Sequence, residues 1–333
     1  MQWLLSRPEN LRGLLQILAP DLAAAVDTSR AQAVPTTFIP DDLRKQESDV
    51  IHLVPYRDPV SGKVREIWIY ILIEHQSRPD PTMGLRLLLY IAELWETQRR
   101  EYLRQKTPVS RWRLHPIVPI VFYTGWRRWQ PDLSVAALMD LPQPLREFTP
   151  RFRALYLPLK QTPSERLTAR GHPLGWVLKV MRAEDAAAAE MTSELQEAVA
   201  GLEGVSQKDR AAWAEAIYFL WLLIHHRRSA EEHERLEQVI LNSIRARRRR
   251  AEVSRMFKTM IDLWREEGAA QGMVKAKQED VLHLLRLKFG KLPPAFVKRV
   301  KAVHSVEQLD ALFEQSWEAH SLKDIRWRAK KQK

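Results

Sequence analysis

The chain of 333 residues contains no cysteine. Disulfide bonds, thiolate nucleophiles and zinc sites with sulfur ligands are therefore excluded. Long apolar runs are also missing: the longest, from Ala216 to Ile224, has nine residues, about half of the roughly 20 that a membrane-spanning helix needs. Arg7, Glu9 and Arg12 interrupt the first apolar residues before a signal-peptide core can form. These absences predict a cytoplasmic protein that has no membrane partner and is indifferent to redox state.

Two common classes of motif are absent as well. No G-x-G-x-x-G or G-x-S-x-G string occurs, and Ser61-Gly62-Lys63 lacks the glycine-rich approach of a phosphate-binding loop. The sequence therefore gives no support for ATP use or serine hydrolysis. The ten histidines are scattered, and the adjacent His225 and His226 would point to different faces of a helix. We assign no histidine to a metal.

Positive charge is in excess and unevenly distributed. Residues 227–333 hold 25 Lys and Arg against 15 Asp and Glu, whereas residues 1–226 hold 28 against 26. The C-terminal third thus carries +10 of the net charge of +12. A basic segment of this kind indicates a polyanion partner, because neutralising phosphates releases counterions. A solvated helical surface rich in Arg and Lys explains the composition equally well.

The hydrophobic pattern of the first half predicts strands and helices in one domain. A helix or helix pair is expected over residues 4–27, and an amphipathic helix of about 20 residues from Met83. Short apolar runs predict strands at 48–54, ended by Pro55, at 67–73 and at 117–123. A strand, a crossover helix and another strand imply a mixed sheet with at least one helix packed on it.

Beyond residue 160 the pattern is helical. Helices are expected at 211–228, 230–250 and 253–289, followed by shorter ones from residues 294 and 306. The fold class predicted is α/β, a mixed sheet flanked by helices, followed by an all-α C-terminal region. We divide the chain into residues 1–165, a helical region 166–265 and a small helical domain 266–330.

Two carboxylates are expected at the ends of adjacent strands. Asp49 begins the first predicted strand, and Glu74 ends the second. If the strands pair, both carboxylates reach one edge, where two oxygen ligands can bind a hard cation such as Mg²⁺. Gln76, two residues after Glu74, would face the same side and orient a water or a phosphate. On spacing alone, Asp49 can equally cap a turn while Glu74 simply ends a strand.

Three strings resemble a known family. These are DDLRKQESDVIHLV, IYILIEHQSRPDPTMGLRLLLYIAELW and HPIVPIVFYTGWRRW, and the resemblance covers roughly residues 4–160. They closely resemble the bacterial recombination-promoting nucleases, also labelled transposases. The resemblance implies a restriction-endonuclease-like PD-(D/E)XK domain in which Asp49 and Glu74 are catalytic and bind Mg²⁺ or Mn²⁺. It also implies metal-dependent cleavage of double-stranded DNA and a part in recombination. The stretch from KQEDVLHLL to SLKDI resembles a helical domain of unknown function.

The sequence departs from the family pattern in two ways. Gln76 stands where the motif name has Lys, and a neutral amide cannot stabilise the transition state as a lysine would, although it can hydrogen-bond a water. Family members usually carry an upstream helix with a His-Asp pair, which would precede this chain. Asp41, Asp42 and Glu47 are acids that could replace its carboxylate, or they are plain loop residues. The alternative is a DNA-binding or protein-interaction module that kept the fold without the chemistry.

Further residues are assigned to DNA or to assembly. Arg86, on the helix after the second strand, could reach a phosphate, and Arg127 and Arg128 lie between two tryptophans as in a strand-binding loop. Both arginine sites have structural alternatives, a surface arginine and a packed turn with arginine stems on apolar surface. The run from Arg247 to Arg250 is interpreted as charge at a helix terminus. The long helix 253–289 makes a homodimer possible, although it lacks a sustained heptad.

Overall fold

The computed structural model describes residues 2–34, 50–57, 66–205, 209–319, 321–325 and 327. The chain divides into two compact units, Met1–Val253 and Ser254–Lys333. Residues 1–165 and most of the predicted helical region 166–265 fall in the first unit. The boundaries expected near residues 165 and 265 remain predictions.

The first unit contains a five-stranded mixed sheet with the order β1-β2-β3-β4-β5. Strands β1 to β3 are antiparallel, whereas β4 runs parallel to β3 and β5 parallel to β4. The α/β prediction is confirmed, and so are three of its strands. The two short outer strands were not predicted. The bounds are β1 Gln32–Val34, β2 Val50–Arg57, β3 Glu66–Gln76, β4 Ile117–Tyr123 and β5 Leu155–Pro158.

Strand β2 continues through Pro55, where the sequence predicted its end. Pro55 lies opposite Trp68 of β3 in the antiparallel register. Proline has no N–H to donate to the ladder, but its carbonyl oxygen remains available and accepts a hydrogen bond from the Asp27 backbone N at 3.0 Å. Asp27 thus hydrogen-bonds to the polar group that proline retains, and the strand extends to Arg57.

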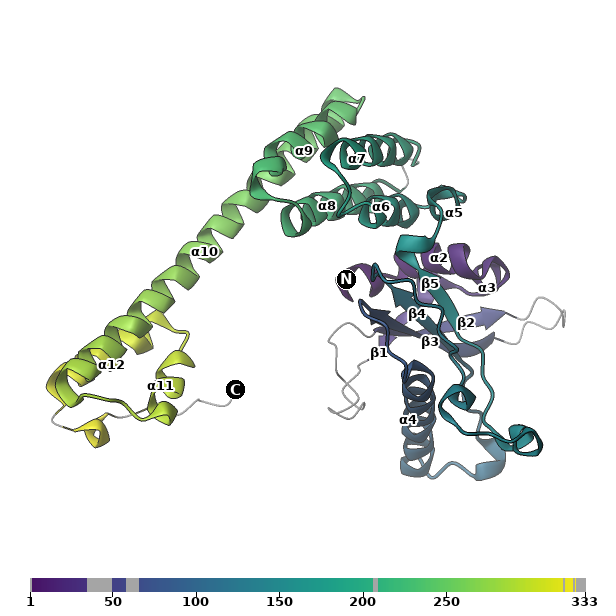
Figure 1. Ribbon diagram of the computed structural model, residues 1–333, viewed down its shortest axis with the longest axis horizontal. Coiled ribbons are helices and arrows are strands. Elements are labelled where there is room, and N and C mark those ends of the chain that lie inside the picture. The colour runs from purple at the N-terminus through teal and green to yellow at the C-terminus, as the bar shows by residue number, and fades with distance from the viewer. Residues whose placement is uncertain are drawn as a thin grey trace. The chain divides into compact units, whose positions relative to one another are not determined.

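Helices cover both faces of the sheet (Figure 1). On one face lies α4 (Met83–Arg104), whose apolar stripe packs on Ile51 and Val121 through Leu87 and Tyr90. This stripe was predicted from the helical spacing. On the other face, the buried imidazole of His52 donates from Nε2 to the Leu5 carbonyl oxygen at 2.8 Å. The N-terminal helices there are α1 Gln2–Leu5, α2 Pro8–Leu18 and α3 Pro20–Ala25, where a helix or helix pair was expected over residues 4–27.

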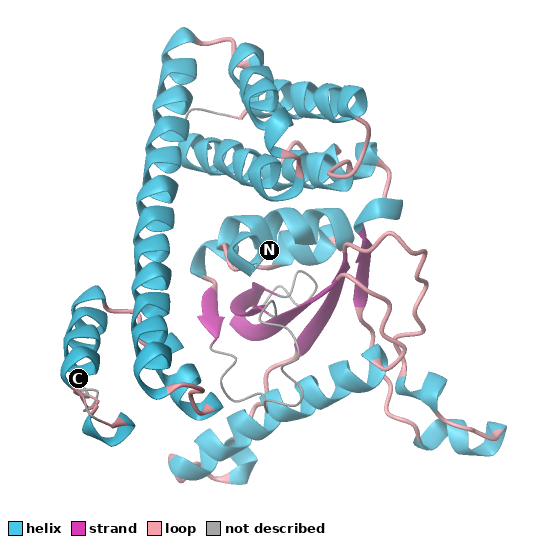
Figure 2. Ribbon diagram, turned by 60° about the vertical axis from the view of Figure 1, so that its left-hand side comes forward, coloured by secondary structure: helices cyan, strands magenta, loops and turns pink. Residues whose placement is uncertain are grey.

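Above the N-terminal helices lies a second helical layer, whose helix α6 packs on α2, as Figure 2 also shows. Its helix α8 is mostly apolar between Trp213 and Ile224, and seven of its side chains are buried. Trp213 and Trp221 are its largest fully buried side chains. The layer consists of α5 Ser164–Thr168, α6 Pro173–Arg182, α7 Ala188–Glu203, α8 Arg210–Arg227 and α9 Ala230–Ser243.

The prediction of one continuous helix over 230–250 is wrong. Helix α9 ends at Ser243, Ile244 has extended backbone angles, and α10 (Arg247–Phe289) begins three residues later. Ile244 is fully buried, and the Arg250 guanidinium donates to its carbonyl oxygen at 2.7 Å. Burying Ile244 and capping its carbonyl stabilise the break more than continued helix would. The arginine run therefore begins a helix.

The second unit has its own core. The last turns of α10 pack with α11 (Pro294–Lys301) and α12 (Val306–Glu318) around buried Leu285, Val300 and Leu309. This all-α arrangement matches the expectation for the C-terminal region. No described helix in either unit has the length and apolar character needed to cross a membrane.

Candidate active site

The two proposed carboxylates belong to the paired ends of β2 and β3. Val50 is the first described residue of β2 and pairs with Ile73, the residue before Glu74. Glu74 itself pairs with Val121 of the parallel strand β4. Asp49, which precedes Val50 in the sequence, lies outside the described residues, as do Asp41, Asp42 and Glu47. The backbone register therefore confirms that β2 and β3 pair, which the site hypothesis requires.

Gln76 is the last residue of β3; its side chain is buried, and its backbone carbonyl oxygen is hydrogen-bonded. Its side chain is only 3% exposed. Its carbonyl oxygen accepts hydrogen bonds from the backbone N of Thr124 at 2.8 Å and from the Thr124 hydroxyl at 3.3 Å. These bonds join the end of β3 to the turn that follows β4. A buried amide at this place is fixed in position but carries no charge.

The turn after β4 comes very close to the chain after β3. A Cβ atom at Gly125 would lie 2.4 Å from the Ser77 carbonyl oxygen and 2.4 Å from the Tyr123 hydroxyl. No side chain fits at that separation, so glycine is required here for close approach. The Thr124-Gly125 pair thus locks together the ends of β3 and β4.

His75 lies between Glu74 and Gln76 in the sequence, and its side chain contributes to the packing of the fold. Its Nε2 is hydrogen-bonded to the Thr124 hydroxyl at 3.0 Å, and its ring centre lies 5.9 Å from that of Phe122. Burial lowers the pKa of His75 to about 4, and the Arg227 cation acts in the same direction. The imidazole is therefore neutral at physiological pH. A cavity of about 600 Å³ borders His75 together with Glu184 and Phe219.

Four polar residues after β3 form one hydrogen-bonded network. Arg86 on α4 donates to the Asp80 carboxylate at 2.9 Å and to the Tyr90 hydroxyl at 3.3 Å. The other carboxylate oxygen of Asp80 accepts from the Thr82 backbone N at 2.8 Å. Burial opposes ionisation of Asp80, but the bonds from Thr82 and Arg86 outweigh it and hold the pKa of Asp80 below its ordinary value. Arg86 is 11% exposed and engaged within the protein.

The sequence signal for this network was the string of Asp, Met, Arg and Tyr after β3. In the structure, Asp80 and Tyr90 hold Arg86, and Met83 is buried in the α4 cluster. The assignment of Arg86 to a phosphate remains a prediction. Because of its ion pair, the side chain would have to share its donors between a phosphate and Asp80.

The stretch from Trp126 to Trp129 is anchored by a hydrogen bond of the largely exposed Trp126 at one end and by packing of Trp129 at the other, and it is exposed in its middle. Trp126 donates from Nε1 to Asp185 at 2.9 Å, and Trp129 packs edge-on against Tyr123 with ring centres 5.0 Å apart. The hydroxyl of Tyr123 donates to the Arg127 carbonyl oxygen at 2.7 Å. The side chains of Arg127 and Arg128 are exposed. The tryptophans thus anchor a turn that presents two cations.

Within the described ranges, no three His, Asp or Glu side chains gather as metal ligands. The side chains of Asp49 and Glu74 are not among those described. The chemistry of the proposed donor set still fits a divalent cation, since carboxylate and carboxamide oxygens are its preferred protein ligands.

A family model described as "Putative transposase, YhgA-like" matches residues 1–211. The chain belongs to this family. The match covers the sheet, α4 and the helices up to the start of α8. The resemblance to the recombination-promoting nucleases found in the sequence strings is therefore confirmed.

Curated relatives include both active and inactive proteins by name. The recombination-promoting nuclease RpnD of Escherichia coli O157:H7 is 28% identical over 124 residues, which are 37% of this chain and 43% of RpnD. The inactive recombination-promoting nuclease-like protein RpnE of Escherichia coli K12 is 32% identical over 120 residues, 35% of each chain. YjiP of the same strain, named putative inactive, is 32% identical over 87 residues, 26% of this chain and 79% of YjiP. The aligned part spans less than half of RpnD and RpnE. No solved structure matches the chain.

Proposed function

We propose that the chain is a metal-dependent endonuclease that hydrolyses phosphodiester bonds of double-stranded DNA and promotes recombination. The observation that carries the proposal is the pairing of Val50 with Ile73. Asp49 and Glu74 each adjoin one member of this pair in the sequence. Membership of a family that includes named nucleases supports the same reaction. The mixed sheet flanked by helices supports a restriction-endonuclease-like core.

In this proposal Asp49 and Glu74 hold Mg²⁺ or Mn²⁺. Such an ion lowers the pKa of a bound water and offsets charge that develops on the phosphate. The protein's own contribution in this proposal is the pairing of β2 with β3, which brings the neighbours of the two carboxylates together, and the Gln76 amide at the end of β3. Because Gln76 is buried and joined through its backbone to Thr124, its amide can orient a water or a phosphate oxygen without reorganising.

The test is nicking of supercoiled plasmid in Mg²⁺ or Mn²⁺, with EDTA as the blank. Asp49→Asn and Glu74→Gln remove the charges at nearly constant size, and Glu190→Ala changes an exposed acid on α7 as the control. We expect both site variants to fall to the EDTA level and the control to keep parental activity. Retained nicking in either site variant contradicts the assignment, provided that circular dichroism shows each variant folded.

A second function has specific support. Two relatives are named inactive. In this chain Gln76 is neutral and Arg86 is paired with Asp80, so neither residue offers an unpaired positive charge to the transition state. A DNA-binding or protein-interaction module with the nuclease fold would retain plasmid in a gel-shift assay without nicking it in any metal. That result would replace the enzyme with the module.

A further inference from the structure

The chain between β4 and β5, residues 124–154, is here called the arginine segment. It has five arginines and no lysine, against three acids. All five side chains are exposed. Within the part of the chain that the structure describes, none of them forms an ion pair with a carboxylate. The five are Arg127, Arg128, Arg146, Arg151 and Arg153.

The arginines of α4 behave differently. Arg99 and Arg100 both contact Glu96, at 2.5 and 3.0 Å, and Arg104 contacts Glu101 at 2.7 Å. Those cations are neutralised locally by acids one turn away. Among the described residues the arginine segment shows no such pair, so its exposed charge raises the local potential for an anion.

An exposed aromatic side chain stands among these cations. Phe148 ends the short helix η4 (Gln143–Phe148) and is 76% exposed. Leu145, on the same helix, is 51% exposed. Arg146 precedes Phe148 by two residues and Arg151 follows it by three. A solvent-facing aromatic ring between arginines is the combination with which proteins bind single-stranded nucleic acids, since bases stack on the ring and phosphates pair with the cations.

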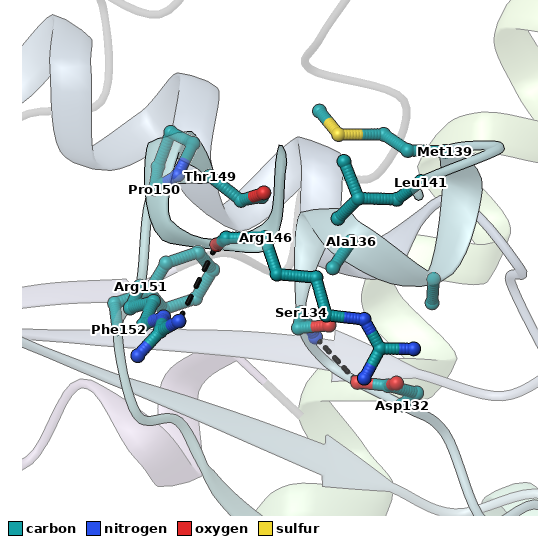
Figure 3. A pocket seen from close by; sticks show the side chains of 11 residues that line it. Asp132, Ser134, Ala136, Met139, Leu141, Arg146, Thr149, Pro150, Arg151 and Phe152 are labelled. Carbon is teal, nitrogen blue, oxygen red and sulfur yellow. Dashed lines mark hydrogen bonds between the residues drawn. The ribbon is translucent and has the colours of Figure 1, made fainter. Parts of the chain in front are cut away.

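A cavity of about 560 Å³ adjoins the same helix (Figure 3). Arg146 reaches across it toward Asp132, whose carboxylate already accepts the Ser134 backbone N at 2.9 Å. Arg151 donates once, to the Arg146 carbonyl oxygen at 3.3 Å. Both guanidinium groups therefore keep donors for a ligand at the rim of the cavity. Leu141 gives the cavity an apolar wall.

The segment is anchored next to the candidate edge. It begins at Thr124, whose backbone N is bonded to Gln76. Farther on, Ser134 lies against the first turn of α4, where a Cβ at Gly84 would be 2.6 Å from the Ser134 carbonyl oxygen. Val135 is buried in η3 (Val135–Leu138), which packs on α4. Figures 1 and 2 show the segment beside α4. Its exposed cations are thus carried on a fixed support.

We propose that the arginine segment binds a DNA strand that carries unpaired bases, with Arg146 and Arg151 at its phosphates and Phe148 stacked on a base. The inference rests on the proposed function in one respect, that DNA is the substrate. It adds a preference: DNA with a single-stranded gap binds more tightly than a continuous duplex of equal length.

The base-stacking part is tested by fluorescence anisotropy in EDTA with a gapped and a continuous duplex. Phe148→Ala should weaken binding of the gapped DNA about fivefold or more, the lower range for losing one stacked base. Phe148→Tyr should stay within about twofold because tyrosine keeps the ring. Leu103→Ala removes a comparably exposed apolar side chain from α4 and serves as the control. Equal affinity of Phe148→Ala and the parent for gapped DNA overturns the proposal.

The phosphate part is tested by the salt dependence of binding. The double variant Arg146→Gln/Arg151→Gln should reduce the slope of log K against log salt by roughly 1.5, the value for two lost contacts. Arg104→Gln, already paired with Glu101, should leave the slope unchanged. If Phe148→Ala leaves DNA binding unchanged and instead changes the molar mass measured by light scattering, the surface around Phe148 joins two copies of the chain and the DNA assignment is wrong. Because binding is measured without metal, these outcomes are independent of whether Asp49 and Glu74 support cleavage.

Discussion

Lys160 is a cation of the first unit with a buried side chain, and its replacement gives the sharpest stability prediction. Its side chain is 2% exposed in η5 (Leu159–Gln161), directly after β5. The amino group donates to the carbonyl oxygens of Met181 and Arg182 at the end of α6 and to Glu184, each at 3.1 Å. It thereby ties the last strand of the sheet to the helical layer.

The same amino group supports the arginine segment. It lies 4.5 Å from the centre of the Trp126 ring, and Asp185, which accepts from Trp126, is 3.3 Å away. A Lys160→Met substitution keeps the stem and removes the charge. It leaves two helix-terminal carbonyls without this donor. It also leaves Glu184, whose side chain is 7% exposed, to the more distant Arg227 cation at 3.4 Å.

The expected loss is about 3–5 kcal/mol, the range for breaking a buried ion pair by removing one partner. In a unit of 253 residues, each kcal/mol lowers Tm by about 2–4 °C, so the transition should fall by roughly 6–20 °C. Calorimetry of the full chain measures the shift. Arg104→Met, which removes a 76% exposed cation, should leave Tm nearly unchanged, because solvent screens an exposed ion pair.

A double-mutant cycle with Glu184→Gln separates the ion pair from the lost carbonyl bonds. The double variant Lys160→Met/Glu184→Gln should be more stable than the sum of the two single changes predicts, by at least about 1 kcal/mol. A loss below about 1 kcal/mol in Lys160→Met, or strict additivity in the cycle, refutes the reasoning that Lys160 is a buried tie.

Three other substitutions have defined outcomes. Leu87→Ala, at a fully buried position on α4, should cost about 2–5 kcal/mol in urea unfolding, whereas the exposed Leu103→Ala should change little. Gly125→Ala places a Cβ 2.4 Å from a backbone carbonyl oxygen and should cost about 1–3 kcal/mol or more by the same assay. Burial lowers the pKa of His172 to about 4, so the unfolded chain binds this proton first and stability falls as pH drops from 6.5 toward 4. His172→Asn, which keeps an acceptor for the Leu174 backbone N, should reduce that pH slope by about one proton; an unchanged slope would show that His172 is not the group that titrates.

The sequence predicted those elements whose pattern is long enough to be distinctive. Strands β3 and β4 are continuous apolar runs, and α4 has a buried stripe that extends from Met83 to Leu94. The edge strands β1 and β5 have three and four residues, too few for an alternation to stand out. They are strands because β2 and β4 supply hydrogen-bonding partners, which a local pattern does not reveal.

The break between α9 and α10 shows the same limit for helices. Residues 230–250 have helix-forming composition throughout, so propensity predicted one helix. The break at Ile244 depends on burial of that side chain and on the Arg250 guanidinium folding back onto its carbonyl. Both are tertiary contacts, and they outweigh the small free-energy differences between residues in helix propensity.

The strands that carry the proposed site were predictable, whereas side-chain partners were not. The strand predicted at 67–73 with Glu74 at its end is observed as β3, which continues two residues farther, to Gln76. The engagement of Arg86 could not be foreseen from helical spacing. It requires the turn after β3 to bring Asp80 back against α4, a geometry that the order of residues leaves open.

The E-H-Q string combines two roles on alternating residues of β3, since neighbours in a strand face opposite sides of a sheet. His75 is packed against Phe122, hydrogen-bonded to Thr124 and neutral, so it offers no positive charge to a phosphate and serves the packing of the fold. Glu74 and Gln76 occupy the positions to which we assign chemistry. A variant of this chain that had lost cleavage activity would still need His75 for packing and Gln76 for its hydrogen bonds with Thr124. The string therefore predicts the fold more firmly than the activity, and replacing the Glu74 carboxylate is the substitution that separates the two.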